Sequence, residues 1–194
     1  MKHLSFVALL LSAAAPATPG GVTRSIYGLD PSKTEIHYTL HDPLHTVHGE
    51  FHLKAGRLIL DPESGRASGE MVIDMTSGAS GSGSRDRRMH KEIIESGRYP
   101  EAVFTPEHVN GHVAPEGESQ IDVQGIFRIH GADHDLTLHF TVQASDGQFT
   151  AATHFVIPYV KWGMKNPSNF FLRVDDKVEI DVQAVTALVL SESV

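Results

Sequence analysis

The chain of 194 residues contains no cysteine, so neither a disulfide nor a thiolate ligand can hold its structure together. It also lacks a G-x-S-x-G elbow, an H-E-x-x-H motif and a glycine-rich phosphate loop. Histidine and aspartate are plentiful, but the members of a catalytic triad need only meet in space, so no triad can be assigned. We therefore do not expect an enzyme, and stability must come from a hydrophobic core.

Basic residues are scarce relative to acidic ones. The chain has 16 lysines and arginines against 24 aspartates and glutamates, and its formal net charge is −8 at pH 7. This balance disfavours nucleic acid, and the surface of an anionic bilayer, as the main partner. It sets no limit on an apolar ligand.

Long apolar runs are absent except at the N-terminus, which reads MKHLSFVALLLSAAAPA. Its apolar part is shorter than the roughly 20 residues of a membrane-spanning helix. A basic start, a short apolar run and small residues are typical of a secretory signal peptide. We predict a signal peptide over 1–17, a single domain over 18–194, and a periplasmic or secreted protein.

Apolar and polar residues alternate through most of the remaining sequence, as at Ile36, Tyr38 and Leu40. This period of two indicates strands with one apolar and one wet face. Turn segments such as DPES, GADH and SDGQ separate the runs, which predicts about eight antiparallel strands. Such strands can close into a barrel or pack as a sandwich, and the pattern leaves both open.

One segment follows a helical period instead. Met89, Ile93 and Ile94 recur at helical spacing between a serine-glycine loop and Pro100. Gly97 is placed to end such a helix, and Pro100 prevents its continuation. The prediction is an all-β domain with one substantial helix over about 85–96.

Several segments resemble, in the same order, those of the YceI-like family. YGLDP at 27–31 and VHGEF at 47–51 are similar to its opening, and SRDRRMHKEIIESGRYPEAVF at 84–104 resembles its central part. VQGIFRIHGADHDLTL at 123–138 is similar to a strand and tight turn of that family, and the tail from Ile157 to Val182 resembles its exported branch. The resemblance covers nearly the whole chain after the signal peptide.

The resemblance implies an eight-stranded, lipocalin-like antiparallel barrel that binds a ligand and needs no catalytic residue or cofactor. The ligand would be a polyisoprenoid or a similar long amphiphile, such as a polyprenyl phosphate or a quinone. A plain packed core is the alternative, because small barrels often fill with side chains. From their strand faces we expect the lumen to be lined by Tyr38, Phe51, Met71, Ile73, Phe127, Leu138, Phe140 and Phe155.

A polar head group would need donors at the mouth of the barrel. Candidates at the start of the helix are Arg85, Arg87, Arg88 and Lys91. Candidates in and after the loop PYVKWGMK are Lys161, Trp162, Lys165 and Arg173. The arginines and lysines can equally be solvated surface charges. The loop can form a lid, a patch for transient membrane contact, or a plug in the barrel end.

Five histidines recur at steps of 4, 4, 3 and 4: His37, His41, His45, His48 and His52. Pro43 and Gly49 disfavour a continuous helix here, so we expect a hairpin. If Tyr38 faces Phe51 in that hairpin, His37 faces His52 and His41 faces His48. A surface site for Zn²⁺ or Cu²⁺, or an acid sensor, is therefore the second hypothesis, against ordinary polar residues on a wet face. The oligomeric state is left open.

Overall fold

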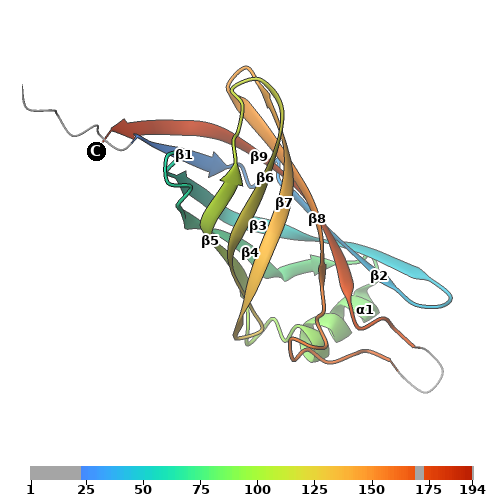
Figure 1. Cartoon of the computed structure of the whole chain (residues 1–194). Helices are drawn as coiled ribbons and strands as arrows, with labels where there is room; N and C mark the ends of the chain where they lie inside the picture. The colour runs from blue at the N-terminus through green and yellow to red at the C-terminus, as the bar shows by residue number, and fades with distance from the viewer. Residues whose placement is uncertain (1–22, 169–172, 194) are drawn as a thin grey trace, which may run out of the picture.

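The strands of this protein form one antiparallel sheet that closes on itself (Figure 1). The computed structural model describes residues 23–168 and 173–193, and the predicted signal peptide lies outside them. Within the described residues no helix is long and apolar enough to cross a bilayer. The strands there are β1 (Thr23–Leu29), β2 (Glu35–His41), β3 (Thr46–Leu60), β4 (Ala67–Ala79), β5 (Glu101–Gly111), β6 (Gly117–Ile129), β7 (Ala132–Ser145), β8 (Gln148–Ile157) and β9 (Val178–Ser193).

The barrel has eight positions, of which one is shared by two strands. β2 to β9 pair with their neighbours in sequence, and the pairing of β2 with β9 closes the ring. β1 also lies between β3 and β9, but it pairs with residues 57–60 of β3, whereas β2 pairs with residues 46–51. The turn at Asp30, whose carboxylate accepts the Ser32 N–H at 2.9 Å, separates the two. The predicted eight-stranded antiparallel barrel is confirmed.

The interior is built by the alternation that the sequence shows. In β6, Ile121, Val123 and Phe127 are buried, whereas Gln124 and Arg128 are exposed. Successive side chains of a strand point to opposite faces, so each strand contributes every second residue to the lumen. Most of the buried apolar residues of the strands form one continuous cluster.

The helical segment is shorter and less regular than predicted. α1 (Gly83–Arg88) passes directly into η1 (Met89–Ile93), a wider turn in which the Ile94 N–H donates to the Met89 carbonyl at 3.0 Å. The expected range of 85–96 was therefore too long at its C-terminal end. Glu95, with φ of 45°, takes the left-handed conformation that was expected at Gly97.

The β2–β3 hairpin is tighter than predicted. Ile36 pairs with Phe51, and Tyr38 pairs with Gly49 rather than with Phe51. The Asp42 carboxylate accepts the N–H groups of Leu44 and His45, both at 2.8 Å, and this local turn closes the hairpin two residues earlier than expected. The assignment of side chains to the inner and outer faces is unaffected, because a shift of two residues keeps every side chain on the same face of the sheet.

Candidate functional site

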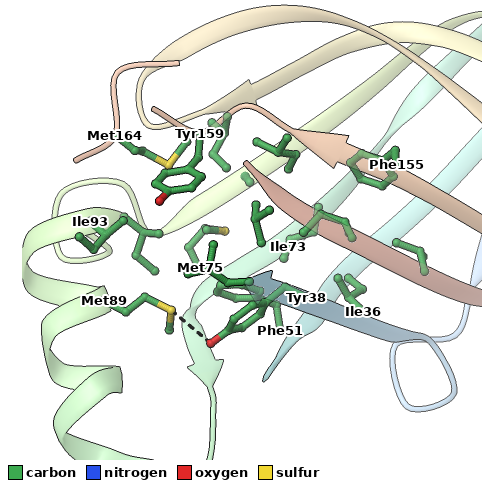
Figure 2. A pocket seen from close by; sticks show the side chains of 18 of the residues that line it. Ile36, Tyr38, Phe51, Ile73, Met75, Met89, Ile93, Phe155, Tyr159 and Met164 are labelled. Carbon is green, nitrogen blue, oxygen red and sulfur yellow. Dashed lines mark hydrogen bonds between the residues drawn. The ribbon is translucent and has the colours of Figure 1, made fainter. Parts of the chain in front are cut away.

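A cavity of about 810 Å³ occupies the inside of the barrel, and most of its wall is apolar. The structure therefore differs from the packed-core alternative. All residues predicted to line the lumen border this cavity: Tyr38, Phe51, Met71, Ile73, Phe127, Leu138, Phe140 and Phe155. They come from six different strands, so the face of each strand converges on one space (Figure 2).

The helical segment covers the lumen at one end. Met89, Ile93 and Ile94 line the cavity from this segment (Figure 2). The Tyr38 hydroxyl donates to the Met89 sulfur at 3.5 Å, and the rings of Tyr38 and Phe51 lie 5.4 Å apart. Burial raises the pKa of Tyr38, so its hydroxyl stays protonated and remains a donor. This contact joins β2 to the helical segment across the cavity.

The connection between β8 and β9 packs against the same end of the barrel (Figure 1). Tyr159 and Met164 are buried and border the cavity. The Tyr159 hydroxyl donates to the Asp175 carbonyl at 2.6 Å, and burial with two nearby aspartates raises its pKa to about 12. Trp162 is half-buried and stacks on His134 with ring centroids 4.0 Å apart. Of the arrangements left open above, the structure favours a loop tucked into the barrel end.

Polar side chains gather at one edge of the cavity, beside α1. Arg85 and Arg88 border it there and are exposed, so the cavity reaches the surface at this point. The Arg85 guanidinium donates from Nη2 to the Ser80 carbonyl at 2.8 Å, and Arg88 donates from Nη2 to the Pro167 carbonyl at 3.0 Å. These bonds hold both side chains at the mouth.

The β2–β3 hairpin forms the other side of the mouth. His41, Asp42 and His45 border the cavity from this hairpin. The amide hydrogen bonds from Leu44 and His45, with His45 itself, hold the pKa of Asp42 below its usual range. Of the charged residues in the described chain, Asp42, Arg85 and Arg88 border the cavity, so the mouth carries one negative and two positive charges.

Most of the head-group candidates, Lys91 and Arg173 included, do not border the cavity. Arg87 and Lys161 are exposed, and Lys165 pairs with Glu92 at 3.3 Å. Trp162 packs behind the wall, on His134. Arg85 and Arg88 of the predicted set lie at the mouth, whereas the hairpin residues Asp42 and His45 were not predicted. The sequence around these residues shows no pattern that marks them as part of the mouth, because the mouth forms only where the hairpin, α1 and the loop meet.

The predicted histidine pairs do not form, because the hairpin register differs. His37 faces Glu50, and His48 faces Thr39, whose hydroxyl lies 3.1 Å from its Nδ1. His41 faces Thr46 and not His48. Among the described residues no group of three histidine, aspartate or glutamate side chains is already arranged around a metal position. The site proposed for His37, His41, His48 and His52 is therefore wrong in its pairing.

Two hydroxyls face the cavity without a partner. The Oγ1 atoms of Thr34 and Thr153 are buried and make no hydrogen bond within the described chain. A buried hydroxyl that lacks a partner is costly, so each is available to a polar atom of a bound molecule. Both lie among the apolar residues of the cavity wall.

A closed antiparallel barrel with an apolar cavity and a polar mouth defines a lipocalin-like barrel. Within that class, the model of the YceI-like domain family matches residues 27–186, so the chain belongs to the YceI-like family. The resemblance found in the sequence is thereby confirmed. A search of curated proteins finds no match.

Solved structures share the fold at low sequence identity. A polyisoprenoid binding domain from Saccharophagus degradans, implicated in plant cell wall breakdown, superposes with a TM-score of 0.68 at 17% identity, over 84% of this chain and 98% of that one. BcnA from Burkholderia cenocepacia gives 0.67 at 19% identity, over 81% and 98%. The YceI protein of Campylobacter jejuni gives 0.60 at 15% identity, over 79% and 90%.

Proposed function

We propose that this protein binds a long amphiphile, of the polyisoprenoid type, with its chain in the lumen and its head group at the mouth. The observation that carries the proposal is the division of the cavity wall, which is apolar along the barrel and charged only beside α1 and the β2–β3 hairpin. A molecule with one polar end and a slender apolar chain matches this division. The role is one of binding and carriage rather than catalysis.

The energetics favour such a ligand over a small polar one. Each methylene group moved from water into the lumen contributes about 0.8 kcal/mol, so a long chain binds tightly without polar contacts. The cavity volume of about 810 Å³ is within the usual range of ligand pockets. The similarity in fold to a polyisoprenoid binding domain supports the same class of ligand.

The head group is expected at Arg85 and Arg88. Guanidinium groups form strong, charge-assisted hydrogen bonds with phosphate oxygens, which favours a prenyl phosphate. A quinone would instead meet the hydroxyls of Thr34 or Thr153 deeper in the lumen. With its predicted signal peptide, the protein would carry this ligand in the periplasm or outside the cell.

The test is native mass spectrometry of the protein purified from its own host, followed by organic extraction. We expect one isoprenoid-type molecule per chain. Phe155→Arg, which places a charge in the lumen, should abolish this bound mass, because an unpaired charge cannot share an apolar channel with the ligand. Val156→Arg is the matched control, since Val156 is the next residue of β8 and is 45% exposed.

A second lumen variant covers the case in which Phe155→Arg does not fold. Ile73→Trp fills the channel without adding charge, and the purified variant should also carry no bound lipid. Circular dichroism identifies which variants are folded. A wild-type chain that carries no lipid, or a folded lumen variant that carries as much as Val156→Arg, contradicts the proposal.

A further inference from the structure

Histidines and carboxylates alternate across the outer face of the barrel. His37 of β2 faces Asp181 of β9, and Asp181 faces His154 of β8. On the next two strands of the sheet, His139 of β7 faces Asp122 of β6. All five residues point away from the lumen, on the opposite side of the sheet from the proposed lipid site.

The two halves of this row meet between β7 and β8. The last paired residues of these strands at this point are Phe140 and Thr153. His139 and His154 each lie one residue beyond this last pair, on the outer face of two neighbouring strands. A shallow hollow in the surface is bordered by both of them, and also by His37, Glu35 and Asp181.

Both neighbouring histidines are oriented by a carboxylate. His139 Nδ1 lies 2.6 Å from Asp122 Oδ1, and His154 Nδ1 lies 2.8 Å from Asp181 Oδ1. An ionised carboxylate can only accept a hydrogen bond, so Nδ1 carries the proton in each ring. In the neutral imidazole, Nε2 then carries the free lone pair.

These lone pairs face solvent. The side chains of His139 and His154 are 74% and 54% exposed, and no described residue forms a hydrogen bond with either Nε2. A histidine whose Nδ1–H is held by a carboxylate and whose Nε2 is free has the arrangement of a metal ligand. Two such histidines border the same hollow.

We propose that His139 and His154 bind a divalent transition metal ion, of which Zn²⁺ is the simplest case, through their Nε2 atoms. Imidazole nitrogen is a good ligand for Zn²⁺, Cu²⁺ and Ni²⁺. Asp122 and Asp181 are positioning residues that orient the rings, and together with Glu35 they supply the negative charge that a cation favours. This metal site differs from the hairpin histidine site and is independent of the lipid proposal.

The coordination is that of an open surface site. The described residues contain no group of three ligands already converged on one point, so two imidazoles bind and water completes the sphere. His37 also borders this hollow, and its Nε2 lies 3.5 Å from Glu35 Oε2.

Calorimetric titration of the untagged, full-length chain with Zn²⁺ tests the proposal. We expect one Zn²⁺ per chain at this site. The double variant His139→Gln/His154→Gln should lose more affinity than a variant in which only Asp122 or Asp181 is replaced. The matched control is His48→Gln/His52→Gln, which removes two histidines from the hairpin and should leave the affinity unchanged. All four side chains are on the surface, so these variants should fold.

The orienting role of the carboxylates gives a second readout. Asp122→Asn and Asp181→Asn keep both imidazoles but remove the charged acceptor, and each should weaken Zn²⁺ binding by about 10-fold to 100-fold. Absence of Zn²⁺ binding, or equal affinity in the double variant and the hairpin control, overturns the proposal. The bound lipid measured by mass spectrometry should be the same in all these variants, so failure here is distinct from failure of the lipid proposal.

Discussion

The ring of Tyr38 lies directly over Gly49, its partner on the neighbouring strand. A Cβ atom at position 49 would overlap both the Tyr38 ring and the carbonyl oxygen of Ala79. Gly78 plays the same part for Phe51 and Met89, because a Cβ there would come within 2.5 Å of Phe51 Cε1 and 2.8 Å of Met89 Cε. Two glycines therefore shape the end of the cavity that the helical segment covers.

Gly49→Ala should destabilise the protein by about 1–3 kcal/mol, the usual cost of adding a methyl group to a tightly packed site. The Tyr38 ring would have to move, and the hydrogen bond to Met89 would be lost with it. Urea denaturation measures the change. Gly97→Ala is the control, because no atom lies within 4 Å of a Cβ at that position. Equal stability of the two variants would show that Tyr38 does not need the space above Gly49.

The arginines at the mouth should discriminate between head groups. In Arg85→Gln/Arg88→Gln, the affinity for a prenyl phosphate should fall by about tenfold or more, since hydrogen bonds to charged groups contribute about 1.5–3 kcal/mol. The affinity for the corresponding prenyl alcohol should change little. Arg87→Gln is the matched control, because Arg87 is exposed but does not border the cavity. Fluorescence titration with both lipids makes the comparison, and an equal loss for phosphate and alcohol would contradict a head-group role.

His134 should make the fold less stable in acid. Burial lowers its pKa, although the charge of Asp133 acts in the other direction, and its Nε2 has no partner among the described residues. Because the folded pKa lies below the unfolded value of about 6.5, the unfolded chain binds more protons as the pH falls. The contribution of neutral His134 to the free energy of unfolding is therefore present above pH 6.5. It is lost as the pH falls from there toward the pKa of His134 in the folded protein.

The measurement is the free energy of unfolding at pH 7.5 and pH 5.5. Other groups also titrate in this range, so the quantity that matters is the difference between the wild-type chain and His134→Gln. We expect a smaller loss in acid for the variant. An identical loss would mean that the charged His134 is accommodated against Trp162 without cost.

The lumen residues could be predicted from the sequence because the side-chain period of a strand is two. Ile73 and Phe155 were assigned to the inner face from parity alone, and both border the cavity. The hairpin shows why this works, since its register was wrong by two residues and Tyr38 and Phe51 still point inward. The same shift separates the predicted histidine pairs, because a cross-strand pair depends on the register and not only on the face of the strand.

The mouth could not be predicted in the same way. Arg85 and Arg87 are close in sequence and equal in character, yet only Arg85 borders the cavity. The difference comes from the direction in which each side chain leaves a short, irregular helical segment, and from the acceptor that Ser80 provides for Arg85. Neither is visible in composition or spacing.

The sequence by itself determined the strands, their inner faces and the family, because alternation and ordered motifs are local properties of the chain. Only the tertiary structure decided that the lumen is hollow, where it opens, and which surface histidines are neighbours. His139 and His154 border one hollow because β7 and β8 are neighbours in the sheet, and the register of the adjoining strands places Asp122 and Asp181 beside them. Such meetings depend on the closure of the whole sheet, which no single stretch of sequence contains.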